Sequence, residues 1–235
     1  MDRRSFIESC AARLGCVSAA AALPAAWADD ARPKAYPAAL LVDEQQRPIR
    51  AAGLAPLTNY VFHYPFEATP VFLLDLGKAA APATLATKDG DGYAWPGGVG
   101  PRRSIVAYSA ICAHRLVYPT RQVSFISFRK TRAAKGVRDE LIHCCSENSQ
   151  YDPAQGARVL SGPAEQPLCA VLLAHDPKAD TLTAHATLGG ELFNEFFRKY
   201  EMKLSLEVGA RAVNPVGGQA VVRRLDQFCR NTIQC

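Results

Sequence analysis

Short apolar runs separated by Pro- and Gly-rich segments follow one another along most of the chain. Many of these runs are rich in Val, Ile, Phe and Tyr, which suit the pleated surface of a β-sheet. The run that ends at Pro65 is an example, since its alternating aromatic and β-branched residues are closed by a proline. We therefore expect strands at residues 38–42, 59–65, 71–76, 104–111, 122–128, 141–143, 170–174 and 181–186.

Two stretches depart from this pattern. Residues 192–200 place apolar side chains at the spacing of one helix face, which predicts a core-facing helix near the C-terminus. Residues 79–104 contain several glycines and prolines and end near Arg102-Arg103. That composition predicts a loop.

The N-terminus has the pattern of an export signal. Arg3-Arg4 resembles the twin-arginine motif, and an uncharged, Ala-rich stretch at 14–28 ends in a small-x-small cleavage site before Asp29. We expect a signal peptide at 1–28 and a location in the periplasm or on the outer face of the inner membrane. An uncleaved membrane anchor and an ordinary amphipathic helix are the alternatives.

Length and charge limit the function classes. The chain has 235 residues and 49% hydrophobic residues, enough for a substantial core. The net charge of +5 is compatible with an acidic protein partner but too small to indicate nucleic-acid binding by itself. The sequence contains no helix-turn-helix, zinc-finger or phosphate-loop pattern and no internal repeat.

Five of the eight cysteines lie outside the central motif. Cys10 and Cys16 fall in the expected signal peptide. Cys169 lies in an apolar strand and is expected to be a buried core thiol. Cys229 and Cys235 either form a disulfide in an oxidising compartment or are two free thiols.

The remaining three cysteines belong to two segments that carry the chemistry. The first is Cys112-Ala113-His114, and the second begins with Cys144-Cys145. Thiolate and imidazole groups from two loops are typical ligands of zinc or of an iron–sulfur cluster. Downstream of the second segment lie two further short elements, Ser149 with Tyr151-Asp152, and then Gly162-Pro163-Ala164.

This order of boxes resembles the Rieske [2Fe–2S] domain, over roughly residues 105–175. The resemblance implies an all-β fold, an antiparallel β-sandwich of roughly six to ten strands, with an inserted cluster-binding subdomain and one C-terminal helix. The expected organisation is a linker and first strand at 29–58, followed by a Rieske-like domain at 59–235. The cluster-binding part would span about 105–170.

The resemblance also implies a ligand set. Cys112, His114 and Cys144 match three family ligand positions, whereas Glu147 stands where the family has histidine. Glu147 and Cys145, the residue next to Cys144, are therefore alternative fourth ligands. His143 is a third alternative, although strand alternation would point it away. The two cysteines that join the loops by a disulfide in the family are also replaced, by Val117 and Ser146.

Four further residues match family positions around the cluster. Ser149 and Tyr151 match hydroxyls that donate hydrogen bonds to cluster sulfurs, and Gly162-Pro163 matches the loop that covers the cluster. We expect one [2Fe–2S] cluster and a single-electron relay to a redox partner protein or a larger oxidoreductase subunit. Alternatives are a structural or assembly subunit that has lost the cluster, and an interaction domain stabilised by zinc.

A basic run follows the expected strand at 122–128, within a long insert between the two boxes. Two interpretations are open: a solvated hairpin tip, or a docking surface for an acidic redox partner. Its basic residues are Arg129, Lys130, Arg132, Lys135 and Arg138.

Overall fold

The computed structural model describes residues 32–130 and 140–235. The expected signal peptide, Cys10, Cys16 and three residues of the basic run (Arg132, Lys135 and Arg138) lie outside these residues. The described part is mostly β-structure, which confirms the predicted all-β class. No helix within it is both long and apolar enough to cross a bilayer.

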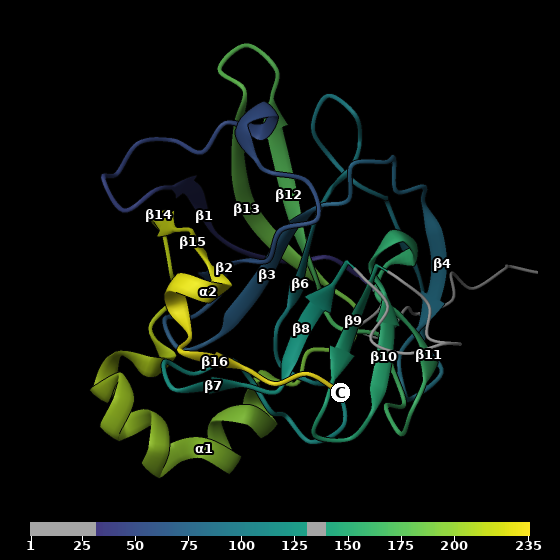
Figure 1. The fold of residues 1–235 in the computed structure, drawn as a ribbon, viewed down its shortest axis with the longest axis vertical. Helices are drawn as coiled ribbons and strands as arrows, with labels where there is room; N and C mark the ends of the chain where they lie inside the picture. The colour runs from purple at the N-terminus through teal and green to yellow at the C-terminus, as the bar shows by residue number, and fades with distance from the viewer. Residues whose placement is uncertain (1–31, 131–139) are drawn as a thin grey trace, which may run out of the picture.

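An eight-stranded sheet is the main body of the molecule, with the strand order β14-β1-β13-β12-β6-β3-β2-β15 (Figure 1). Neighbouring strands are antiparallel except β1 and β14, which run parallel. The strands are β1 (Lys34–Val42), β2 (Tyr60–His63), β3 (Pro70–Asp75), β6 (Ile105–Ser109), β12 (Ala170–Asp176), β13 (Thr181–Leu188), β14 (Gly218–Val221) and β15 (Arg223–Arg224). Contacts between β14 and β2 curl this sheet towards a barrel.

A smaller four-stranded antiparallel sheet lies beside the main sheet and carries the second cysteine segment (Figure 1). Its strand order is β11-β10-β9-β8. It consists of β8 (Ile126–Arg129), β9 (Leu141–Cys144), β10 (Ser149–Asp152) and β11 (Arg158–Ser161). Two further pairs are the hairpin of β4 (Ala83–Ala86) with β5 (Gly92–Trp95), and the parallel pair of β7 (Val123–Ser124) with β16 (Asn231–Thr232).

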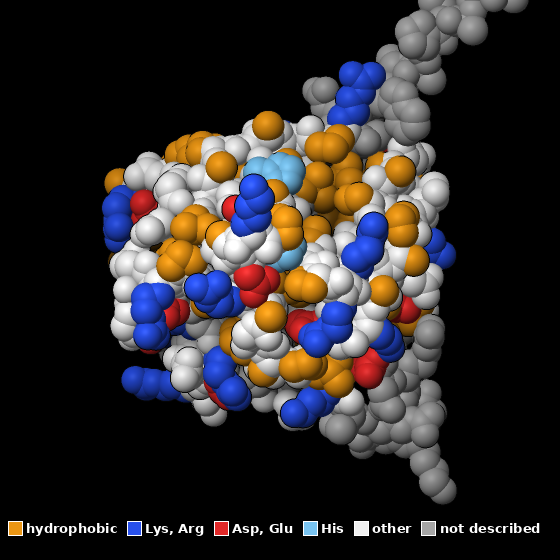
Figure 2. All heavy atoms as spheres, turned by 90° about the horizontal axis from the view of Figure 1, so that it is seen from above, with side chains coloured by type: hydrophobic (Ala, Val, Ile, Leu, Met, Phe, Trp, Pro, Cys, Tyr) orange, Lys and Arg blue, Asp and Glu red, His pale blue; other side chains and the backbone are white. Residues whose placement is uncertain are grey.

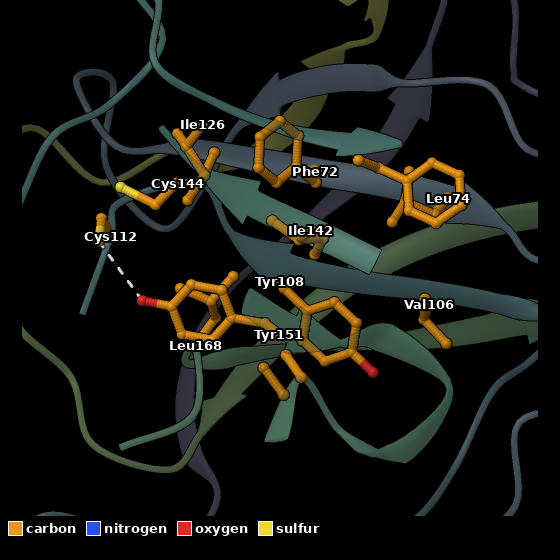
Figure 3. Packing of buried hydrophobic residues seen from close by; sticks show 14 of the residues in the cluster. Phe72, Leu74, Val106, Tyr108, Cys112, Ile126, Ile142, Cys144, Tyr151 and Leu168 are labelled. Carbon is orange, nitrogen blue, oxygen red and sulfur yellow. Dashed lines mark hydrogen bonds between the residues drawn. The ribbon is translucent and has the colours of Figure 1, made fainter. Parts of the chain in front are cut away.

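Alternation along the main-sheet strands places apolar side chains on both faces. In β3, Val71 and Leu73 pack into one buried cluster, whereas Phe72 and Leu74 pack into another. The second cluster joins the two sheets, because it also contains residues of the small sheet such as Ile142 (Figure 3). Burying each such side chain contributes about 1.5–3 kcal/mol, so this shared core holds the small sheet firmly on the main one.

Helix α1 (Phe193–Glu207) is the long C-terminal helix that the apolar spacing predicts. It buries Phe193, Phe196 and Leu204 against Ile111 and Tyr118, on either side of the first cysteine segment. The remaining helical elements are α2 (Leu225–Phe228) and the 3-10 turns η2 (Ala51–Gly53), η3 (Pro153–Gln155) and η4 (Gly209–Val213).

Two local expectations need correction. Residues 79–104, expected as a loop, contain the β4–β5 hairpin, in which Tyr93 and Trp95 are buried in alternation. The strand expected at 122–128 is divided into β7 and β8, with Phe125 partly exposed between them. The stretch 29–58 contributes β1, which lies between β13 and β14 in the main sheet.

The charges on the surface are mixed. Figure 2 shows one face of the molecule, on which Lys and Arg side chains are interspersed with Asp, Glu and apolar groups. Over the described surface as a whole, several basic side chains are paired with acidic ones, including Lys34 with Glu191 and Arg223 with Glu44. This face therefore has no continuous basic surface of the kind that binds nucleic acid.

Candidate metal centre

Two tight turns bring the two cysteine segments together. The first turn follows β6 and is closed by the N–H of Cys112 donating to the C=O of Val117 at 2.9 Å, and by the N–H of Leu116 donating back to Cys112 at 3.0 Å. The second turn connects β9 to β10, in which Cys144 pairs with Ser149. The first turn thus begins three residues after β6, at Cys112, and the second begins at Cys144, the last residue of β9.

The thiols of Cys112 and Cys144 meet at the base of these turns (Figure 3). Both residues are 0% exposed, and their side chains hydrogen-bond to each other. The Oη of Tyr151, which is also buried, lies 3.4 Å from the Sγ of Cys112 and accepts the N–H of Ala113 at 3.3 Å. A sulfur that binds a metal carries no proton, so in that state the Tyr151 hydroxyl would be the donor of this contact.

The two thiols titrate in opposite directions. The hydrogen bond from Cys144, followed by that from Tyr151, lowers the pKa of Cys112 to about 6. The Cys112 sulfur in turn raises the pKa of Cys144 well above its usual range, together with burial. The pair therefore loses its first proton from Cys112 more easily than its second from Cys144, and a bound metal ion would favour the loss of both.

His114 and Glu147 form the second pair of groups, one from each turn. The Nδ1 of His114 lies 3.8 Å from the Oε2 of Glu147, and the Nε of Arg115 lies 3.5 Å from its Oε1. The Nδ1 atom is buried and has no hydrogen-bond partner in the described part of the chain. A buried nitrogen without a partner is unfavourable unless something else binds it, so its position suits a metal ligand.

These four side chains are arranged as two pairs. Within residues 32–130 and 140–235, no three His, Cys, Asp or Glu side chains surround one point as the ligands of a single metal ion. A Rieske-type centre requires two ligands on each of its two irons. The sulfur pair and the His114–Glu147 pair match that number of ligands.

The predicted covering loop lies against the second turn. The N–H of Ala164 donates to the Oγ of Ser149 at 3.2 Å, and Ser149 is fully buried. Gly162 has φ = 90°, and a Cβ there would come within 2.4 Å of the Ser149 Cα. Glycine is therefore required for this approach, which places Pro163 at the surface beside the turn.

Cys145 requires a correction. It forms a disulfide with Cys235, with the two Cα atoms 5.4 Å apart, so it has no thiolate to offer as a fourth ligand. Both expectations for the C-terminal cysteines, a Cys229–Cys235 disulfide and two free thiols, are also wrong. Cys235 is bonded to Cys145, and Cys229 is a buried thiol that donates to the C=O of Asn231 at 3.0 Å. The partners in this disulfide are 90 residues apart, and no local signal in the sequence connects them.

His143 lies away from the sulfur pair. Ile142 and Cys144 pack into the core between the two sheets, and alternation along β9 points the side chain of His143, which lies between them, to the other face. Burial, followed by the charge of Arg129, lowers the pKa of His143 to about 4. The alternation expected along this strand therefore explains why His143 is not grouped with the proposed ligands.

Arg129 is also not the exposed residue that a solvated hairpin tip or a docking surface would require. It is 6% exposed, and its guanidinium donates to backbone carbonyls of the C-terminal segment, so it cannot belong to a docking surface. Lys130 is exposed. Sequence reasoning missed both this contact and the position of Arg115 beside Glu147, since neither follows from spacing along the chain.

No family model matches this chain. Among solved structures, it is similar to the soluble domain of the Rieske protein II from Sulfolobus acidocaldarius, at 28% sequence identity. The match covers 66% of this chain and 82% of that chain, with a TM-score of 0.45. We therefore take the function from the geometry of the two turns.

Proposed function

We propose that this protein is a Rieske-type electron-transfer protein. In this proposal, Cys112 and Cys144 hold one iron of a [2Fe–2S] cluster, and His114 and Glu147 hold the other. The observation that carries the proposal is the pairing of these side chains across two turns: two buried thiols in contact, and a buried Nδ1 that faces a carboxylate and has no hydrogen-bond partner among the described residues. When bound, such a cluster accepts and releases single electrons.

The surrounding residues would set the potential. The Tyr151 hydroxyl points at the Cys112 sulfur, and a hydrogen bond to a ligating sulfur stabilises the reduced state. Glu147 acts in the opposite direction, because a carboxylate adds negative charge where the family has neutral imidazole. Arg115 lies on the outer side of Glu147 and offsets part of that charge. The resulting potential would lie below that of a two-His centre with the same surroundings, for which the range is about −150 to +300 mV.

A relay role suits this arrangement better than catalysis on a bound substrate. An open groove of about 490 Å³ in the described part is lined by residues such as Trp95, Leu172 and His185, and by none from the two turns. A relay needs an edge close to the surface, and His114 and Glu147 are both partly exposed there. A redox partner protein, acidic on the docking side, or a larger oxidoreductase subunit would receive the electron.

Reconstitution of the purified protein with iron and sulfide tests this function. We expect a red-brown protein with about two iron and two sulfide per chain, and an electron paramagnetic resonance signal after reduction. Replacing Cys112, His114, Cys144 or Glu147 by alanine should abolish the cluster. The control is Cys229→Ala, which removes a buried thiol outside both turns and should leave the cluster in place.

The outcome separates the alternatives. A wild-type protein that stays colourless and binds no zinc would indicate the structural or assembly subunit. A colourless protein with one zinc per chain would indicate the zinc-stabilised domain.

A further inference from the structure

The last seven described residues, 229–235, which we call the C-terminal strap, run along the insert between the two cysteine segments (Figure 1). Strand β16 of the strap lies parallel to β7 of the insert. The N–H of Ile233 donates to the C=O of Ser124 at 2.8 Å, and the N–H of Arg230 donates to the C=O of Arg121 at 3.0 Å. The strap is thus fixed on the insert by backbone hydrogen bonds along its length.

The strap is joined covalently to the second turn. Its Cys235 forms the disulfide with Cys145, which directly follows Cys144 and lies two residues before Glu147. The N–H of Cys145 also donates to the C=O of Phe125, between β7 and β8, at 2.6 Å. Cys145 is therefore held both by the strap, through its disulfide, and by Phe125, which joins β7 to β8.

A buried arginine reinforces the same junction. The Nη1 of Arg129 donates to the C=O of Cys235 at 2.5 Å, and its Nη2 donates to the C=O of Ile233 at 3.0 Å. The same Nη2 lies 2.7 Å from the Sγ of Cys145. A buried guanidinium is favourable only where its donors have partners, so Arg129 and the strap depend on each other.

The outer part of the turn, residues 145–148, has few backbone hydrogen bonds of its own in the described part of the chain. The N–H of Glu147 donates to the C=O of Cys144 at 3.3 Å, a long hydrogen bond, while Ser146 and Asn148 are exposed. Val117 and Ser146, the two positions at which the family pattern would place a disulfide between the turns, have no sulfur. Beyond its side-chain contacts with His114 and Arg115, the position of Glu147 therefore depends on the backbone that Cys145 anchors.

We propose that the C-terminal strap is a clamp that positions the second turn, through the Cys145–Cys235 disulfide and Arg129. The clamp orders the backbone from Cys144 to Glu147, and the strap acts on the proposed ligands only through that backbone. That the clamp positions cluster ligands rests on the proposed function, whereas the attachment of the turn to the strap does not. Arg129 and Cys145 are positioning residues in this sense.

Hydrogen exchange on the full chain tests the clamp with or without a cluster. In the double variant Cys145→Ser/Cys235→Ser, amides of residues 144–149 should exchange at least about tenfold faster than in wild type, because local opening no longer needs the strap to detach. Amides of the main-sheet strand β3 should be unchanged. Opening the disulfide of the wild type with a dithiol, which is oxidised as the bond becomes two thiols, should give the same result, since Cys235 is exposed. Cys229→Ser, in the same strap, is the control and should behave as wild type.

The reconstituted cluster provides the second readout. We expect the double variant to lose its cluster faster than wild type and to give a broadened resonance spectrum, because Glu147 takes up a range of positions. Arg129→Ala should move both readouts in the same direction. Unchanged exchange of residues 144–149 in the double variant would overturn the clamp, whatever the cluster does. A wild type that binds no cluster but shows the exchange difference would overturn the proposed function and leave the clamp in place.

Discussion

Glu147 is the residue at which this site departs most from the Rieske pattern. Its Oε2 faces the Nδ1 of His114 at 3.8 Å, while its Oε1 is directed to Arg115. A carboxylate in this place is anionic where imidazole is neutral, so in the proposed function a cluster held by Glu147 would carry one more negative charge. Its oxidised state would be favoured as a result, and transfer to a strong oxidant would be easier than oxidation of a quinol.

Glu147→His should therefore raise the reduction potential. Removing one ligand charge is expected to raise it on the order of 100 mV, and the spectrum should move towards that of a two-His centre. Protein-film voltammetry measures the first and resonance Raman the second. Arg115→Ala should move the potential the other way and by less, because Arg115 is exposed and screened by solvent. An unchanged potential in Glu147→His would exclude Glu147 as a ligand.

A second prediction at this scale concerns His63, which packs its ring 5.7 Å from that of Phe228. Burial, followed by the charges of Arg121 and Arg223, lowers the pKa of His63 to about 4. Its pKa in the unfolded chain is about 6.5, so the folded state resists protonation. The stability tied to a neutral His63 is complete above about pH 6.5 and is lost as the pH falls towards 4, by about 2–3 kcal/mol.

Urea unfolding at pH 7 and pH 4 checks this dependence. Wild type should lose about 2–3 kcal/mol more than His63→Gln between these two values. His185→Gln, at an exposed position, is the control and should follow wild type. Equal losses in wild type and His63→Gln would contradict the lowered pKa.

Helix α1 braces the first turn. Tyr118, four residues after His114, stacks edge-on against Phe196 with ring centroids 4.9 Å apart, and its hydroxyl donates to Glu207 at 3.2 Å. The Nζ of Lys199 donates to the C=O of Arg115 within the turn. The helix therefore has for the first turn the role that we propose for the strap at the second.

Phe196→Ala should accordingly destabilise the fold and the first turn together. Phe196 is 0% exposed, and removing its ring leaves a cavity that costs about 3–5 kcal/mol. Met202→Ala on the same helix, at a side chain 81% exposed, should change stability by less than about 0.5 kcal/mol. Denaturant unfolding gives both values, and hydrogen exchange of residues 112–118 shows whether the loss extends to the turn. If Phe196→Ala lowers the free energy of unfolding by less than about 1 kcal/mol, the helix does not support the first turn.

The elements that sequence analysis predicted are those with a strong local pattern. Strand β3 reads as a continuous apolar run because both of its faces are buried, and α1 has a clear helical spacing. The β4–β5 hairpin was missed because its glycines and prolines suggest a loop, while the burial of Tyr93 and Trp95 depends on distant strands. Likewise the Cys145–Cys235 disulfide depends on the path of the strap, which the local pattern does not contain. Three proposed ligands, Cys112, His114 and Cys144, followed from a family register, which already includes the three-dimensional arrangement, whereas the register left the fourth open between Glu147 and Cys145.

At the scale of the whole molecule, three separate parts of the chain converge on the two turns. The main sheet supplies the base of both through β6 and the core shared with β9. Helix α1 supports the first turn, and the strap supports the second. Because these supports come from residues distant in sequence, the site is complete only when the whole chain has folded.

That dependence has a consequence for export. A protein whose cofactor must be inserted into a completed fold needs a route that carries folded chains, and Arg3-Arg4 resembles the signal for such a route. A disulfide between Cys145 and Cys235 also suits an oxidising compartment, since cytosolic thiols are kept reduced. The signal motif and the disulfide are independent observations that favour the same location.

Changing both Arg3 and Arg4 to lysine should therefore hold the protein in the cytoplasm at its precursor length. There, Cys145 and Cys235 should both react with an alkylating reagent added before lysis, whereas in the exported wild type they should be protected as a disulfide. Cell fractionation, with mass spectrometry of the alkylated peptides, measures the two together. Arg13→Lys is the matched control, because it changes an arginine of the same segment outside the pair and should leave export unaffected. Normal appearance of the double variant in the periplasm would remove the twin-arginine interpretation, and a disulfide in the retained protein would show that the bond does not depend on export.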